Sequence, residues 1–252
     1  MEKQTLYVAF STQKGRVGKT AFTVLVASYL HYAKGKNVAV VDCDFPQHSI
    51  NAMCKRDAEQ IGTDEYYKRL AYEQFKALNK KAYPILCSKP EAAVETANEF
   101  LENIEEKPDV IFFDLPGNVG NAGVLKSIAN MDYIFTPIIA DRIVLESCLS
   151  FADAVHKNLV GKDAMRLKAL SLFWNKVDGR EKTDLYQIFE KAIAELGLPL
   201  MKTFIPGTKK YNREMSDKRT VFRSTLFPAD KRLTKGSNLE ELINEILEII
   251  KL

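Results

Sequence analysis

Cysteine and histidine are scarce in this sequence, which limits the chemistry it can support. Only four cysteines and three histidines occur among its 252 residues. No C-x-x-C pair is present and the histidines show no ligand spacing, so neither a zinc finger nor an iron–sulfur cluster is expected. The cysteines lie far apart, at Cys43, Cys54, Cys87 and Cys148. This spacing suits a reducing compartment, in which we expect them to fill small apolar spaces.

Long apolar segments and strong net charge are also missing. No apolar run approaches the roughly 20 residues of a membrane-spanning helix, and the first ten residues lack the layout of a signal peptide. We therefore expect a cytoplasmic protein. Hydrophobic residues make up 46% and charged residues 27%, which is typical of a folded globular chain. The formal charge of +3 is too small to indicate nucleic acid by itself.

Short apolar runs alternate with longer helical patterns along the chain. The expected strands are Leu6–Ser11, Asn37–Asp42, Val110–Asp114, Tyr133–Pro137, Ala169–Val177 and a weaker Met201–Ile205. The expected helices are Thr20–Ala33, Asp64–Lys80, Pro90–Glu105, Val144–Asn158, Lys182–Leu196 and Asn238–Ile250. This alternation predicts one α/β domain over residues 1–252, with helices flanking a mostly parallel, doubly wound sheet. Ligands of such sheets lie beyond the carboxyl ends of the strands.

A loop rich in glycine and basic residues joins the first strand to the first helix. It reads QKGRVGKT from Gln13 to Thr20. Backbone amides and the positive end of a helix dipole can cradle phosphates in such a loop. Lys19 would reach the β- and γ-phosphates, and the Thr20 hydroxyl would ligate Mg²⁺. The residues expected around the nucleotide phosphates are Gly15, Arg16, Val17, Gly18, Lys19, Thr20 and Ala21.

The loop departs from the plain G-x-x-x-x-G-K-[ST] pattern, because Gln13 replaces the first glycine and Lys14 adds a second lysine. It thereby resembles the deviant Walker A loop, K-G-G-x-G-K-[ST], of the ParA, MinD and nitrogenase iron-protein group. The resemblance implies a P-loop NTPase fold and a homodimer formed on ATP binding, in which Lys14 reaches the partner's nucleotide. A cation supplied in this way can matter greatly, since an arginine finger in trans raises the rate about 10³–10⁵-fold.

Arg16 stands where the related loops have their second glycine. Glycine at such a position permits positive φ or a close backbone approach, and a side chain there costs on the order of 1 kcal/mol. Two consequences are open at this point. Arg16 either contacts phosphate across the dimer or weakens dimerisation and turnover.

Two expected strands end in aspartates. The segment VDCDFPQ, which contains Asp42 and Asp44, resembles the D-x-D-P-Q switch I of ParA proteins with Phe45 inserted. The resemblance implies that Asp44 orients the attacking water and accepts its proton, while Asp42 supports the Mg²⁺ shell. The segment VIFFDLPG ends in Asp114 and resembles Walker B followed by switch II at Gly117. Asp114 would hold Mg²⁺ through water.

The strand that begins at Ala169 is followed by the motif N-K-V-D, from Asn175 to Asp178. In ParA-like proteins an asparagine at this place reads the adenine edge, whereas N-K-x-D is also the guanine-reading pattern of many GTPases. The other motifs favour ATP over GTP. Pro206 and Gly207 resemble a late loop that closes over the base in this family.

Positive charge is concentrated between residues 202 and 235. Ten lysines and arginines stand against three acidic residues there, a local charge of +7. Such a segment can bind DNA through its phosphates without reading sequence. The residues expected to contact DNA are Lys209, Lys210, Arg213, Lys218, Arg219 and Arg223. The last helix is amphipathic but carries glutamates on its polar face, which anionic lipid would repel, so we expect it to dock on the core rather than on a membrane.

The chain as a whole resembles the small ParA proteins of conjugative elements, which bind DNA non-specifically as ATP-bound dimers. The resemblance implies a weak, nucleoid-associated ATPase that acts in partition or transfer of plasmid or mobile DNA. It also implies a ParB-like protein that stimulates hydrolysis. Two alternatives stay open, namely a MinD-like ATPase that positions a protein complex and a nucleotide-binding module with little hydrolysis. Lys14, Lys19 and Asp44 are the expected catalytic residues.

Overall fold

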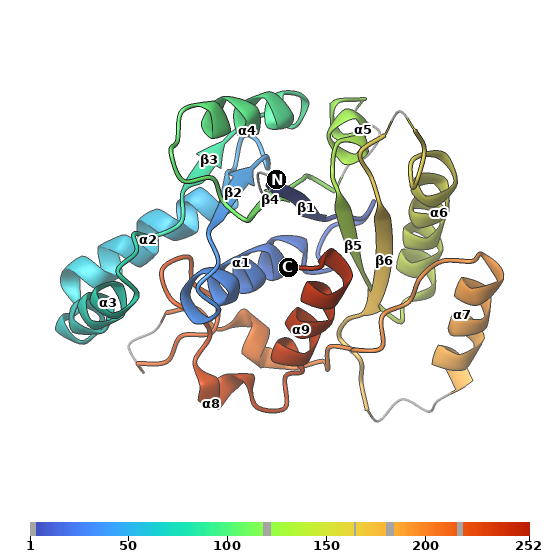
Figure 1. Cartoon of the computed structure of the whole chain (residues 1–252). Coiled ribbons are helices and arrows are strands. Elements are labelled where there is room, and N and C mark those ends of the chain that lie inside the picture. Colours follow the sequence, from blue (N-terminus) through green and yellow to red (C-terminus); the bar gives the residue numbers. More distant parts are fainter. Residues whose placement is uncertain (1–3, 118–121, 164, 180–183, 216–218) are drawn as a thin grey trace.

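The apolar runs of the sequence form one six-stranded parallel sheet with the strand order β3-β2-β4-β1-β5-β6 (Figure 1). The computed structural model describes residues 4–117, 122–163, 165–179, 184–215 and 219–252. The strands are β1 Leu6–Phe10, β2 Val38–Asp42, β3 Ile85–Cys87, β4 Val110–Asp114, β5 Tyr133–Ile138 and β6 Ala169–Trp174. Because all pairs are parallel, the carboxyl ends of β1, β2 and β4 lie together at one edge.

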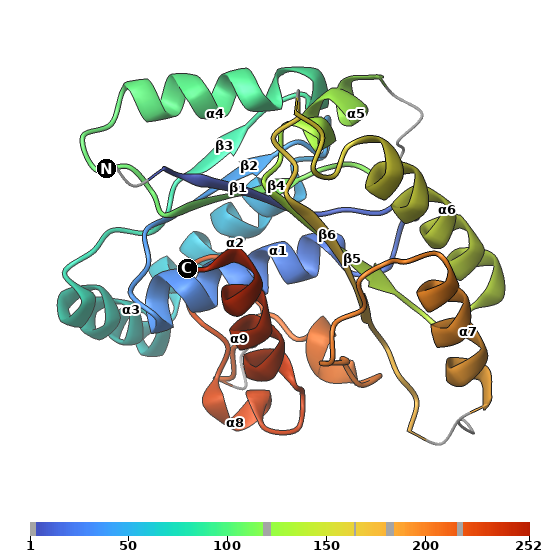
Figure 2. The same cartoon turned by 45° about the vertical axis from the view of Figure 1, so that its right-hand side comes forward.

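The helices pack on both faces of this sheet (Figures 1 and 2). They are α1 Lys19–Ser28, α2 Ser49–Thr63, α3 Glu65–Leu78, α4 Ala93–Glu102, α5 Ala122–Ala129, α6 Arg142–Asn158, α7 Asp184–Glu195, α8 Lys231–Thr234 and α9 Leu239–Ile250. One apolar cluster joins the sheet to α1, α9 and the beginning of α2. A second joins the opposite face to α4, α5, α6 and α7. The doubly wound α/β fold predicted from the alternation is confirmed.

Most expected elements are present, with several changes. A π-helical turn, Tyr29–Ala33, continues α1, and a 3₁₀ turn, Pro90–Ala92, precedes α4. The expected beginning of the helix at Lys182 lies outside the described residues. The expected strand Met201–Ile205 is wrong. Only isolated bridges flank this segment, from Leu200 to β6 and from Pro206 to Val177. β3, α2 and α5 were not predicted.

The C-terminal helix α9 belongs to the core, as its pattern predicts. Leu239, Leu242, Ile243 and Ile246 are fully buried against the sheet and α1. The Glu245 carboxylate accepts hydrogen bonds from the backbone amides of residues 202 and 203. Among the described helices, none combines the length and hydrophobicity needed to cross a bilayer.

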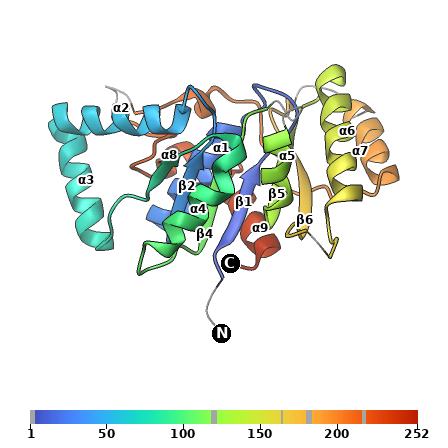
Figure 3. The ribbon, with the colours of Figure 1, turned by 90° about the horizontal axis from the view of Figure 1, so that it is seen from above.

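The pair α2 and α3 extends the molecule at the end opposite α6 and α7 (Figure 3). Tyr67 and Ala71 of α3 pack with Met215, Val221 and Phe227 in a third apolar cluster. This cluster fixes the C-terminal segment, which also reaches the site described below.

Candidate nucleotide site

The loop after β1 leads directly into α1, as the sequence predicts. Gly18 caps α1 with φ 101°, and no described side chain caps this end. A Cβ at Gly18 would stand 3.0 Å from the Phe22 ring, so both the conformation and the space call for glycine. The first amides of α1 therefore remain available to an anion, which the helix dipole also attracts.

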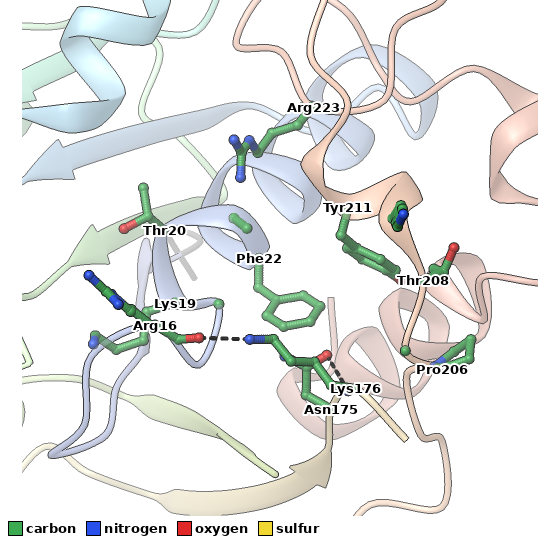
Figure 4. A pocket seen from close by; sticks show the side chains of 14 residues that line it. Arg16, Lys19, Thr20, Phe22, Asn175, Lys176, Pro206, Thr208, Tyr211 and Arg223 are labelled. Atoms are coloured by element: carbon green, nitrogen blue, oxygen red, sulfur yellow. Dashed lines mark hydrogen bonds between the residues drawn. The ribbon is translucent and has the colours of Figure 1, made fainter. Parts of the chain in front are cut away.

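Arg16 adopts the left-handed conformation, with φ 62°. This is the backbone that glycine favours, so the arginine holds it at a cost on the order of 1 kcal/mol. Two residues that follow β6 hold the loop in place. Lys176 Nζ donates to the Arg16 carbonyl at 3.0 Å (Figure 4). Asn175 Nδ2 donates to the Val17 carbonyl at 2.8 Å.

Lys19 is buried at the beginning of α1, where its ammonium donates to the Lys14 carbonyl at 3.0 Å. Burial lowers the pKa of Lys19, and the nearby carboxylates of Asp114 and Asp44 oppose that shift. Gly117 leaves room for this lysine, because a Cβ there would stand 3.0 Å from Nζ and 3.3 Å from the Lys14 carbonyl. Lys19 thus lies between the phosphate loop and the beginning of the predicted switch II.

Asp114 lies fully buried at the end of β4, where Thr20 Oγ1 donates to its Oδ2 at 2.8 Å. Its Oδ1 is buried and accepts no hydrogen bond from the described atoms. Burial raises the pKa of Asp114 to about 7, against the hydrogen bond from Thr20, which lowers it. A hydroxyl and an orphaned carboxylate oxygen side by side are oxygen donors that suit Mg²⁺. The residues therefore fit the ion that the phosphate loop implies.

Asp42 and Asp114 are register partners on neighbouring strands. The Asp42 Oδ2 accepts from the amides of Ile50 and Asn51 at 2.9 and 3.0 Å, so this carboxylate also holds the first turn of α2. Asp44 is half-buried beyond it and accepts from the Ser49 hydroxyl at 3.2 Å. The sequence did not indicate the capping role of Asp42. The roles of Asp42 in the Mg²⁺ shell and of Asp44 in hydrolysis stay predictions.

A pocket of about 560 Å³ opens beside the phosphate loop. It brings the loop together with Asn175, Pro206 and Gly207, the three residues expected near the base, while Asp178 is not among its described lining residues. Figure 4 shows Phe22 and Asn175 between the phosphate-loop residues and Pro206. The basic lining residues are Arg16, Lys19, Lys176, Lys209 and Arg223. No acidic residue is among the described lining, which suits an anionic ligand.

Phe22 and Tyr211 form an aromatic wall of this pocket, with ring centroids 5.9 Å apart. Neither residue was predicted from the sequence. Phe22 lies in an expected helix, where an aromatic residue is typical of the core, and no motif includes Tyr211. Tyr211 lies in a 3₁₀ turn, Lys209–Asn212, and donates to the Ser237 carbonyl at 2.9 Å. The pocket therefore has apolar and basic parts, as a nucleotide requires.

The residues expected to bind DNA do not form one open face. Arg213 and Arg219 are exposed, whereas the Lys210 ammonium donates to the Lys235 carbonyl at 2.7 Å. Lys209 and Arg223 line the nucleotide pocket, and their expected role in DNA binding stays a prediction. Lys218 lies outside the described residues. Lys14 is half-exposed beside the site, and its role toward a partner stays a prediction.

Comparison with known proteins agrees with this geometry. Residues 8–221 match the family model of the CobQ/CobB/MinD/ParA nucleotide binding domain. None of the curated proteins compared matches the sequence of this chain. Among solved structures, a plasmid partition protein of Borrelia burgdorferi bound to AMPPNP is similar, with a TM-score of 0.64 and 20% identity. The match covers 97% of this chain and 99% of that one.

Two further structures show the same fold. The ParA protein of pNOB8 has a TM-score of 0.57 and 14% identity, over 98% of this chain and 99% of that one. MinD of Pyrococcus horikoshii in complex with Mg-ADP has a TM-score of 0.58 and 16% identity, over 98% and 96%. At these identities the likeness is one of fold, and it extends over nearly the whole length of each chain.

Proposed function

We propose that this chain, which belongs to the CobQ/CobB/MinD/ParA family of nucleotide-binding proteins, is an ATP-dependent switch that dimerises on ATP binding and binds DNA non-specifically. Slow ATP hydrolysis resets the switch in partition or transfer of plasmid or other mobile DNA. The observation that carries this proposal is the basic pocket beside the phosphate loop, together with the hydrogen bond from Thr20 to the buried Asp114. The similar partition protein bound to AMPPNP supports it.

The site residues divide the work of hydrolysis. The amides of the phosphate loop and the first turn of α1 hold the phosphates, with Lys19 beside them. Thr20 and Asp114 would hold Mg²⁺, which neutralises phosphate charge when bound. Asp44 orients a water molecule, whose oxygen attacks the γ-phosphorus, and takes its proton as the bond to the β–γ bridging oxygen breaks. Lys14 of a second copy completes the site, and ADP and phosphate leave.

DNA is the proposed surface on which the switch acts. Among the described residues predicted to contact DNA, Arg213 and Arg219 are exposed and lie outside the nucleotide pocket. Contacts of these arginines with DNA phosphates would carry no sequence information, which suits a protein that binds DNA non-specifically. A ParB-like partner that stimulates hydrolysis would release the DNA, and the ATP-bound form would be associated with the nucleoid.

DNA binding as a function of nucleotide and salt tests this function. Wild type should bind a duplex of mixed sequence with ATP but not with ADP or without nucleotide. Its affinity should fall steeply with salt, since each phosphate contact releases counterions. Equal binding in all three states would contradict the switch. Absence of binding in every state would remove DNA as the surface and leave the nucleotide site standing.

A second candidate is a MinD-like ATPase that positions a protein complex, which the fold likeness to MinD favours. A third is a nucleotide-binding module with little hydrolysis, which the strained Arg16 in the phosphate loop favours. ATP turnover that Asp44→Ala abolishes would exclude the third. ATP-dependent, salt-sensitive DNA binding would exclude the second.

A further inference from the structure

The nucleotide pocket contains an arginine that neither the phosphate loop nor the base-side loop supplies. Arg223 belongs to the C-terminal segment before α8 and lines the pocket together with Thr20 and Ala21 of α1. In Figure 4 its side chain extends over α1 from that segment. Only 22% of this side chain is exposed, in contrast to the open Arg213 and Arg219 nearby.

The hydrogen-bonding capacity of Arg223 is only partly used. One terminal nitrogen donates to the Glu214 carboxylate, whereas Nε is buried and has no acceptor among the described atoms. A buried donor without a partner destabilises a protein, so an acceptor is expected to meet it in the functional state. No carboxylate lies among the described lining residues of the pocket. Because the Arg223 side chain lines this pocket, we expect a ligand oxygen to be its acceptor.

We propose that Arg223 binds a phosphate group of the nucleotide and that Glu214 and Arg56 connect this contact to α2. The proposal rests on nucleotide binding at the phosphate loop. A guanidinium offers a planar fork of donors that matches phosphate oxygens, and the first turn of α1, where phosphates are expected, contributes to the same pocket wall. Glu214 also pairs with Arg56 of α2 at 2.8 Å, so it holds two guanidinium groups together.

Helix α2 is tied to the same segment directly after Arg223. The buried Asp57 carboxylate accepts from the Ser224 hydroxyl and from the Thr225 amide, each at 2.8 Å. At its beginning α2 is held by Asp42, two residues before Asp44. One helix thus reaches from the predicted switch I to the residues that position Arg223. Glu214, which does not line the pocket, acts as a positioning residue.

Calorimetric titration with ATP, ADP and adenosine in the presence of Mg²⁺ tests the contact. Arg223→Ala should weaken ATP and ADP binding about tenfold or more, as expected for a hydrogen bond to a charged group. Adenosine binding should stay within twofold of wild type. Arg223→Lys, which keeps the charge but lacks the fork, should weaken ATP binding severalfold. The matched control is Arg69→Ala, an exposed arginine of α3, and should leave all three affinities unchanged.

Several results would overturn the assignment. ATP binding by Arg223→Ala within twofold of wild type would remove the contact, and an equal loss for adenosine would place it on the base or ribose. If Arg223→Ala does not fold by circular dichroism, an ATP affinity of Arg223→Lys equal to wild type would have the same meaning. Glu214→Gln should weaken ATP binding severalfold, and no change would remove the link to α2. Failure of wild type to bind ATP would instead refute the proposed function.

Discussion

At the scale of single residues, the phosphate loop and its neighbours hold conformations and charges that are unfavourable without a ligand. Arg16 occupies left-handed backbone, Lys19 is a buried cation, and Asp114 is a buried carboxyl with one oxygen unpartnered. A polyphosphate with Mg²⁺ supplies the opposite charges to both groups. The strain is thus located where the ligand is expected, a common arrangement in functional sites.

The strain at Arg16 predicts a difference between two substitutions. Arg16→Gly and Arg16→Ala both remove the guanidinium, but only alanine keeps the penalty of a Cβ at φ 62°. We expect Arg16→Gly to exceed Arg16→Ala by about 1 kcal/mol in free energy of unfolding without nucleotide. Urea denaturation of the two variants measures this. Equal stabilities would show that the loop relaxes out of the left-handed conformation.

The buried Asp114 predicts that Asp114→Asn raises the free energy of unfolding by an amount that depends on pH. Because its pKa is raised to about 7, the folded protein keeps this proton between roughly pH 4 and 7, whereas the unfolded chain releases it. Rising pH over this range therefore lowers the free energy of unfolding of wild type through this group. Asparagine does not titrate in this range. The free energy of unfolding of Asp114→Asn relative to wild type should therefore increase by about 1–3 kcal/mol from pH 5 to pH 8.

The measurement is urea denaturation of both proteins at several pH values, with a chelator to remove Mg²⁺. Taking the difference between wild type and Asp114→Asn cancels the titration of groups that do not interact with Asp114. A difference that stays constant with pH would contradict the raised pKa. Addition of Mg²⁺ and ATP should stabilise wild type more than the variant, because the variant lacks one of the expected metal ligands.

At the scale of elements, helix α9 contributes to stability through the side chains that it packs on the core. Ile246 is fully buried, whereas Glu248 two residues later is exposed. Ile246→Ala should lower the free energy of unfolding by about 2–5 kcal/mol, and Glu248→Ala should change it by less than about 0.5 kcal/mol. Thermal or urea denaturation distinguishes these values. Similar small effects of both substitutions would show that α9 does not dock on the core.

The elements that were predictable are those whose pattern is long or fully apolar. β1, β4 and β6 are nearly continuous apolar runs, and the apolar residues of α9 recur at helical spacing. β3 has only three residues at a sheet edge, two half-buried and one exposed, so it gives no pattern in the sequence. Helix α2 buries only Ile50, Met53 and Asp57 among 15 residues, and therefore lacks an apolar stripe.

The same limit applies to the site. Lys19, Thr20 and Asp114 follow from local motifs, because a phosphate loop and an apolar strand that ends in aspartate each have a short signature. Arg223, Glu214 and Arg56 have no such signature, since their proximity depends on how α2 packs against a segment more than 150 residues later along the chain. In the sequence, Arg223 is only one of ten basic residues between positions 202 and 235. Only the fold shows that it faces the nucleotide pocket.

At the scale of the whole molecule, the role proposed for Lys14, which is half-exposed, predicts a dimer that depends on ATP. The variant Asp44→Ala should hold ATP without hydrolysis, so light scattering in ATP should give twice the monomer mass of 28.5 kDa. Adding Lys14→Ala should return the mass to that of the monomer while ATP affinity stays within a few-fold, because Lys14 is expected to act on the partner's nucleotide. Lys34→Ala, an exposed lysine after α1, serves as the control and should leave the dimer intact.

The two lysines of the loop separate binding from assembly. Lys19→Ala should abolish ATP binding itself, since its ammonium lies within the phosphate loop and has no substitute there. A dimer that forms equally well with Lys14→Ala would show that this lysine does not reach across an interface. A dimer that forms without any nucleotide would show that assembly is permanent. In the proposed function, a dimer that requires ATP would dissociate, and so release DNA, once hydrolysis is complete.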